Sequence, residues 1–285
     1  MNVLVIGSSG QLGQCFKDLK GRNPQWFFIS RSNFDYHNLD LLSAYCRQHE
    51  IAVLINTAAY TQVDLAESNK TEAFAINESF VKKLVQLAGE LSLSIIHFST
   101  DYVFSGDTRK AYSELDEVNP KSVYGASKLA GEQALLRSRP LLNGAIIRTS
   151  WLFSEHGNNF VKTMLRLGVE RAELKVVHDQ YGKPTYARHL AAYIIQNLPA
   201  FVDRPVELYH YANEGVCSWY DFATEIMRYS KLECKVKGIP GSEYPTAAER
   251  PAYSALNTEK IVKKTGEHIP NWKFALHECL DKLIN

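Results

Sequence analysis

The sequence predicts an α/β fold built on a doubly wound, Rossmann-like parallel sheet, with a smaller C-terminal substrate-binding region. Three observations support this prediction. Short apolar runs typical of buried strands alternate with longer helical patterns. A glycine-rich turn follows the first of these runs directly. Beyond Trp151 the sequence changes to shorter strands, more turns and clusters of aromatic residues.

The expected elements follow one another along the first half of the chain. The apolar run at 1–6 is too short to span a membrane and is predicted to be the first strand. Further strands are expected at 26–30, 52–56, 94–99 and 145–148, with helices at 39–50, 73–91 and 124–139. This alternation implies βαβ units and therefore a parallel sheet. We expect a dinucleotide-binding domain over 1–148, rejoined by part of 186–210, and a mainly substrate-binding region over 149–285.

The turn after the first strand has the spacing of a dinucleotide-binding loop. Gly7 permits the tight turn, Gly10 lets backbone N–H groups approach a pyrophosphate, and Gly13 allows the helix to pack closely on the strand. The helix N-terminus, with Gln11 and Leu12, adds a positive dipole. We therefore expect a bound nicotinamide dinucleotide here.

The end of the second expected strand indicates which dinucleotide is preferred. Ser30 and Arg31 stand where an acidic residue would bind the ribose hydroxyls of NAD, and an arginine can pair with a 2′-phosphate. This favours NADPH. Asp35 and Tyr36 follow closely and could contact the adenosine part, so NADH use stays possible.

Tyr124 and Lys128 lie four residues apart on an expected helix, so that one helical face carries both. A phenol is a weak acid near neutral pH, but a neighbouring cation stabilises the phenolate and brings the proton within catalytic range. The pair is a candidate proton-transfer device.

Composition excludes several other classes of function. Lysines and arginines number 32 against 31 acidic residues, which gives no electrostatic reason to expect nucleic acid or an anionic membrane as partner. The five cysteines are scattered and odd in number, and the first apolar run is used by a strand rather than a signal peptide, so a reduced cytoplasmic protein is expected. None of the nine histidines has zinc-site spacing, and no metal is expected.

The glycine motif, Thr100 and the Tyr124/Lys128 pair together resemble an extended short-chain dehydrogenase/reductase. Further segments narrow this resemblance to the dTDP-4-dehydrorhamnose reductase family and cover nearly the whole chain. These segments are 57–64, 99–104, 148–151, 159–161, 179–185, 218–223 and 250–251.

The resemblance implies reduction of a 4-keto sugar, dTDP-6-deoxy-L-lyxo-4-hexulose, to dTDP-L-rhamnose. Tyr124 would donate a proton to the developing C4 alkoxide, Lys128 would lower the pKa of Tyr124 and hold the nicotinamide ribose, and Thr100 would orient the carbonyl. Further implied cofactor contacts are Ala58, Ala59, Tyr60, Thr61 and Ser99. Implied substrate contacts are Thr100, Asp101, Tyr102, Val103, Phe104, Trp151, Asn159 and Arg250, whereas Trp219 is expected to be a core aromatic.

Other functions of the same superfamily remain as alternatives. A 4,6-dehydratase would carry glutamate where Tyr102 stands, so elimination lacks its base. A nucleotide-sugar 4-epimerase is harder to exclude, although its family has a small residue in place of Asp101. A non-catalytic NADP-binding regulatory subunit, resembling that of methionine adenosyltransferase, is the alternative outside enzymology.

The resemblance fails at one position that matters for assembly. Some family members dimerise around magnesium through an acidic residue at the position of Cys15, and a thiol is a poor ligand for that cation. We expect no bridging magnesium through Cys15 and either a monomer or a differently built homodimer. The nucleotide attached to the sugar and the glycan that uses the product stay open.

Overall fold

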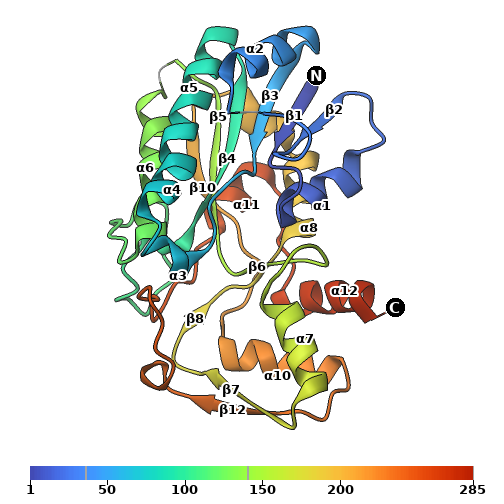
Figure 1. Cartoon of the computed structure of the whole chain (residues 1–285), viewed down its shortest axis with the longest axis vertical. Helices are drawn as coiled ribbons and strands as arrows, with labels where there is room; N and C mark the ends of the chain where they lie inside the picture. Colours follow the sequence, from blue (N-terminus) through green and yellow to red (C-terminus); the bar gives the residue numbers. More distant parts are fainter. Residues whose placement is uncertain (36, 140, 285) are drawn as a thin grey trace.

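The computed structural model describes residues 1–35, 37–139 and 141–284. A six-stranded sheet forms the centre of its larger part (Figure 1), and every neighbouring pair of strands is parallel. In sheet order the strands are β10 (Glu207–His210), β5 (Gly144–Thr149), β4 (Ser94–Thr100), β3 (Ile51–Asn56), β1 (Asn2–Ile6) and β2 (Trp26–Ile29). The predicted fold class is therefore confirmed.

Helices cover both faces of this sheet because its strands carry apolar side chains on both sides. One face packs against α1 (Gln11–Lys20), α8 (Ala187–Gln196), α9 (Leu198–Val202) and α11 (Glu259–Thr265). The other face packs against α2 (Leu39–Gln48), α5 (Phe80–Leu91) and α6 (Val123–Arg137). The short helices α3 (Val63–Ala66) and α4 (Lys70–Phe74) lie beside α6.

The direction of winding reverses between β1 and β3. From β1 the chain passes to β2 on one side, and then crosses to β3 on the other side of β1. In parallel sheets the crevice at such a reversal, outside the carboxyl ends of the strands, is the usual ligand site. The loops after Ile6 and Asn56 therefore border the expected cofactor crevice.

A smaller region with its own apolar cluster lies beyond the carboxyl ends of the sheet (Figure 1). Its helices are α7 (Phe160–Glu170), α10 (Trp219–Tyr229) and α12 (Trp272–Ile284). Its strands form three short pairs: β6 (Leu152–Phe153) with β9 (Thr185–Tyr186), β7 (Glu173–Val177) with β12 (Lys235–Ile239), and β8 (Tyr181–Gly182) with β11 (Cys217–Ser218). Two short 3₁₀ turns follow β4 and β12: η2 (Asp101–Val103) and η3 (Gly241–Glu243).

The helix expected at 73–91 differs from the prediction. It is interrupted by a π-helical turn, η1 (Ala75–Ser79), between α4 and α5. The side chain of Asn77 in this turn bonds groups outside its helix. Such turns often mark functional sites. Within the described ranges, every helix is too short or too polar to cross a bilayer.

Candidate active site

The glycine turn after β1 is shaped by its neighbours as the motif requires. Gly7 has a φ of +84°, and a Cβ there would lie 2.5 Å from the backbone nitrogen of Ala58. A Cβ on Gly13 would lie 2.4 Å from the carbonyl oxygen of Gly7. Both positions therefore exclude larger residues. The N-terminus of α1 follows with Gly10 as its N-cap, and no side chain caps it.

A pocket of about 330 Å³ joins this turn to the loop after β3. Much of its lining consists of expected cofactor contacts, which the fold brings together from three segments of the chain. These are Gly7, Gly10, Arg31, Ala58, Ala59, Tyr60 and Thr61. The pocket therefore spans the reversal point of the sheet, where a dinucleotide would lie.

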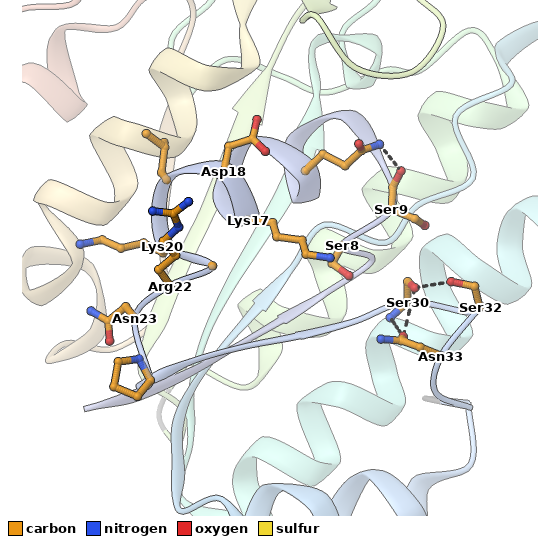
Figure 2. Close-up of a pocket in the computed structure, with 14 residues that line it drawn as sticks. Ser8, Ser9, Lys17, Asp18, Lys20, Arg22, Asn23, Ser30, Ser32 and Asn33 are labelled. Atoms are coloured by element: carbon orange, nitrogen blue, oxygen red, sulfur yellow. Dashed lines mark hydrogen bonds between the residues drawn. The ribbon is translucent and has the colours of Figure 1, made fainter.

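A larger, more open pocket of about 1120 Å³ continues on the other side of the glycine turn. Figure 2 shows Ser30 hydrogen-bonded to Ser32 and Asn33 on one wall, with Lys17 extending toward Ser8. Hydroxyl groups and an ammonium group of this kind suit a phosphate.

Asp35, expected near the adenosine, lines neither pocket; its carboxylate accepts a hydrogen bond from the backbone N–H of His37. Tyr36 lies outside the described residues. Any contact of either residue with the cofactor stays a prediction.

Helix α6 presents the expected proton-transfer pair. It begins after Ser122, whose hydroxyl accepts a hydrogen bond from the Gly125 N–H. Lys128 is buried, and its Nζ donates to the carbonyl oxygen of Phe98 in β4 over 2.6 Å. Tyr124 is half-buried at the start of the helix and packs edge-on against Tyr102, with ring centroids 5.6 Å apart.

Burial displaces the acidity of both members of the pair. It raises the pKa of Tyr124 to about 12, an effect opposed by the hydrogen bond with Thr100. It lowers the pKa of Lys128 to about 8, opposed by the carboxylate of Glu132. Desolvation disfavours the charged form of each group, and a lysine with a pKa lowered in this way is more common at functional sites than elsewhere.

Thr100 ends β4 beside the phenol of Tyr124, and it is buried. Its hydroxyl donates to Asp101 Oδ1 over 3.0 Å and accepts from the Tyr102 N–H at 3.2 Å. Burial raises the pKa of Asp101 to about 6, opposed by the hydroxyls of Ser254 and Thr100. Ser99, which precedes this group, is also buried. A phenol, a hydroxyl and a carboxyl group thus meet at the end of one strand.

Three of the expected contacts have their side chains in the core. Val103 and Phe104 form an apolar cluster with Tyr112 and Leu256, in which the rings of Phe104 and Tyr112 stack at 4.1 Å. Leu12 belongs to the core beneath α1. Contact of these residues with ligands would have to involve their backbone.

Trp151 has an unusual backbone conformation, and its indole packs on a second tryptophan. Its φ of +46° is unusual for a residue with a side chain. Its indole stacks on Trp219 with centroids 3.6 Å apart and lies over Gly182, where a Cβ would come within 2.6 Å of the ring. Trp219 is thus half-buried at the edge of the core, and it supports Trp151.

Asn159 connects the two regions of the chain. Its side-chain N–H groups donate to Gln11 Oε1 at 2.9 Å and to the carbonyl oxygen of Ser154 at 2.8 Å, and its Oδ1 caps α7 at the Lys162 N–H. The amide is therefore engaged within the protein. Substrate contact by Asn159 stays a prediction.

Arg250 is paired with an acidic residue that we did not single out as a ligand contact. Its guanidinium donates to both carboxylate oxygens of Asp64, over 3.0 and 2.6 Å. Such bidentate pairs are specific and orient the guanidinium. A diphosphate approaching Arg250 would have to share it with Asp64.

Asn77 is a further residue missed by sequence reasoning. Its side chain accepts from the backbone N–H of Tyr60 at 2.9 Å, and donates to the Tyr60 carbonyl oxygen at 3.0 Å and to the hydroxyl of Ser127 at 2.9 Å. It thereby joins the cofactor loop to the helix that carries Tyr124 and Lys128. A buried amide in an otherwise amphipathic helical pattern was the available signal.

Cys15 lies in the core beneath α1. Cys15 is fully buried, and burial raises the pKa of its thiol to about 12, so that it stays protonated. Asp18, Glu155 and His156 gather nearby, but Arg188 lies 3.6 Å from both carboxylates and supplies a positive charge. A bridging metal and the oligomeric state stay predictions.

The chain is similar to known proteins over its whole length. A family model described as the RmlD substrate binding domain matches residues 1–285. The dTDP-4-dehydrorhamnose reductase of Aggregatibacter actinomycetemcomitans is 39% identical over 285 residues, covering 96% of each chain. The chain belongs to the dTDP-4-dehydrorhamnose reductase family.

Solved structures of this family agree with the fold. The crystal structure of a dTDP-4-dehydrorhamnose reductase from Clostridium acetobutylicum superposes with a TM-score of 0.91 at 38% identity, covering 100% of both chains. The dTDP-4-dehydrorhamnose reductase of Bacillus anthracis, solved in complex with NADP, gives 0.90 at 34% identity and covers 99% of this chain and 100% of its own. The predicted membership of the dTDP-4-dehydrorhamnose reductase family is confirmed.

Proposed function

We propose that the protein reduces the C4 keto group of dTDP-6-deoxy-L-lyxo-4-hexulose with NADPH and releases dTDP-L-rhamnose and NADP⁺. The convergence of Tyr124, Lys128 and Thr100 at the carboxyl end of β4 carries this proposal. These residues come from α6 and from the end of a neighbouring strand, and Lys128 is bound directly to that strand. Membership of a family of reductases supports the reaction class.

The residues present fit a nicotinamide dinucleotide. The close approach of Gly7 to Ala58 leaves a narrow cradle that a Cβ would fill, and the uncapped N-terminus of α1 faces it. Arg31, with Ser30 and Lys17 in the adjoining pocket, would hold a 2′-phosphate, which favours NADPH over NADH. When bound, the cofactor supplies the hydride for C4.

The protein's own residues supply the proton and orient the carbonyl. Thr100 would turn its hydroxyl from Asp101 Oδ1 and donate a hydrogen bond to the C4 oxygen, while Tyr124 would transfer its proton to the same oxygen as negative charge develops. With the hydride on C4 and this proton on the oxygen, the carbonyl would become a secondary alcohol. Lys128, when protonated, stabilises the phenolate that remains on Tyr124, and solvent must then return a proton to this residue.

The sugar would lie between the smaller region and the group formed by Thr100, Tyr124 and Lys128. Trp151, stacked on Trp219 in that region, would supply an aromatic contact, Asp101 and Tyr102 lie close to Tyr124, and Arg250 would supply positive charge for the diphosphate. A half-buried aromatic face with a few polar groups is typical of a sugar-nucleotide pocket.

Purified protein tests the proposal when it is mixed with NADPH and either dTDP- or UDP-linked 4-keto-6-deoxyhexuloses. We expect oxidation of NADPH with the dTDP-linked sugar and formation of the corresponding 6-deoxyhexose. Tight NADPH binding without any turnover would contradict the proposal and favour a regulatory subunit. Interconversion of 4-hydroxy sugars without net NADPH consumption would favour an epimerase.

A further inference from the structure

A buried chain of polar contacts runs from the loop after β3, at Ala58, to Lys128. The backbone N–H of Ala58 donates to Asn56 Oδ1 at 3.1 Å, and Asn56 Nδ2 lies 3.1 Å from His97 Nδ1. The other ring nitrogen of His97, Nε2, lies 3.5 Å from Lys128 Nζ. Asn56, His97 and Lys128 are at most 2% exposed. The chain links the crevice at β3 with the proton-transfer pair on α6.

The first link determines the direction of the others. A backbone N–H can only donate, so the Asn56 atom facing Ala58 must be the carbonyl oxygen. The Asn56 NH₂ group then faces His97 and donates to Nδ1, which must be unprotonated. Burial and the charge of Lys128 hold the pKa of His97 well below its ordinary value, so the ring is neutral. Its single proton therefore lies on Nε2.

This tautomer places an N–H group against Lys128. When Lys128 is an ammonium ion, two donors face each other across 3.5 Å; when it is a neutral amine, its lone pair can accept from His97. The bond from Lys128 to the Phe98 carbonyl is available in both states. His97 thus favours loss of the lysine proton, although it carries no charge itself.

Other groups facing Lys128 do not reverse this preference. Tyr124 and Glu132 lie one turn away on the same helix, and Glu132 favours the ammonium form. The two oxygens of the Glu132 carboxylate, however, accept from Nε and Nη2 of Arg148, over 2.9 and 2.7 Å, which neutralises much of the carboxylate charge. Asp101 acts on the phenol of Tyr124 rather than directly on the lysine.

We propose that His97, oriented by Asn56, is a positioning residue that sets the protonation state of Lys128, and through it the pH above which the Tyr124–Lys128 pair loses its proton. The kinetic part of this inference rests on the proposed reductase function. The structural part, the tautomer of His97 and the titration of Lys128, does not depend on it.

Asn56→Asp should move the His97 proton from Nε2 to Nδ1 with almost no change in the shape of the side chain at position 56. A carboxylate accepts from the Ala58 N–H and also from a proton on His97 Nδ1, as an aspartate orients the histidine of a catalytic triad. The lone pair of Nε2 would then accept a hydrogen bond from the Lys128 ammonium. We expect nitrogen-15 spectra of histidine-labelled protein to show Nε2–H in the wild type and Nδ1–H in the variant.

The titration of Lys128 provides the second measurement. In protein with carbon-13-labelled lysine, we expect the Lys128 midpoint to rise by roughly one pH unit in Asn56→Asp. The alkaline limb of the pH profile for sugar reduction should shift to higher pH by the same amount, because the Tyr124–Lys128 pair keeps its proton to higher pH. His97→Met removes the Nε2–H group that faces Lys128, so the Lys128 midpoint should move in the same direction. Loss of signals in this variant also assigns the His97 resonances in the histidine-labelled protein.

His189→Gln is the matched control. His189 is a partly buried histidine, but it contacts Glu278 and Asn213 rather than Lys128 or Arg148. Its replacement should lower the melting temperature and leave the Lys128 midpoint in place. An Nδ1–H tautomer in the wild type, or an unmoved Lys128 midpoint in Asn56→Asp and His97→Met, would overturn the inference. Absence of sugar turnover together with a shifted midpoint would instead contradict only the proposed function.

Discussion

Lys128 Nζ lies 2.6 Å from the carbonyl oxygen of Phe98, so the side chain that we propose to act on Tyr124 also binds helix α6 to strand β4. The lysine is buried and cannot move freely between solvent and the site. Its contact with β4 positions the phenol relative to Thr100, which ends the same strand. The geometry of the proposed proton transfer therefore depends on the packing between this helix and this strand.

Replacing Tyr124 by phenylalanine removes the proton donor and leaves the ring. We expect kcat to fall by about 100- to 10,000-fold, the usual contribution of a general acid, while NADPH binding stays unchanged. Stopped-flow turnover and fluorescence titration of NADPH would measure the two effects. Tyr229→Phe, in α10 of the smaller region, where the hydroxyl donates to Asp281, should leave both unaffected. Retained turnover in Tyr124→Phe would show that another group donates the proton.

Replacing Arg31 by alanine tests the basis of cofactor preference. Loss of one charge-assisted contact with a 2′-phosphate should raise the KM for NADPH roughly tenfold or more, with little change for NADH, which lacks that phosphate. Steady-state kinetics with both cofactors would measure the ratio. Arg109→Ala, at another exposed arginine, serves as control. Equal losses with both cofactors would place Arg31 elsewhere on the dinucleotide.

Gly182→Ala tests the support of Trp151. The new Cβ would lie about 2.6 Å from the indole, so the ring must move away from its stack on Trp219. We expect kcat/KM for the sugar to fall roughly ten- to hundredfold, with the KM for NADPH unchanged and a shift in tryptophan fluorescence. Gly89→Ala is the matched control, because a Cβ there meets nothing within 4 Å. Unchanged sugar kinetics would mean that Trp151 does not contact the substrate.

The pKa of Asp101 makes stability depend on pH. It is raised from 3.8 to about 6 in the folded protein, so the folded state binds this proton more tightly than the unfolded chain. The resulting stabilisation is complete below about pH 4 and is lost as the pH rises through 6. Between pH 4 and pH 7 the free energy of unfolding of the wild type should fall by about 1–3 kcal/mol relative to that of Asp101→Asn. Urea unfolding of both proteins across this range would measure it; parallel pH dependences would contradict the assignment.

Much of the fold could be predicted because its signals are local. The strand at 51–56 lies within one residue of the expected bounds, and α6 begins one residue before the expected start at Tyr124. The π-helical turn at Ala75–Ser79 could not be predicted in this way. It depends on bonds from Asn77 to Tyr60 and Ser127, which lie 17 and 50 positions away in the sequence.

The sequence by itself determined the alternation of strands and helices, the glycine turn and the spacing of Tyr124 and Lys128. These features depend on side-chain periodicity and on backbone sterics, which act between neighbouring residues. Only the tertiary structure decided that Arg250 is paired with Asp64, that Trp151 rests on Trp219, and that His97 faces Lys128. These contacts join residues 31 to 186 positions apart, so they exist only after the sheet has brought the ends of its strands together.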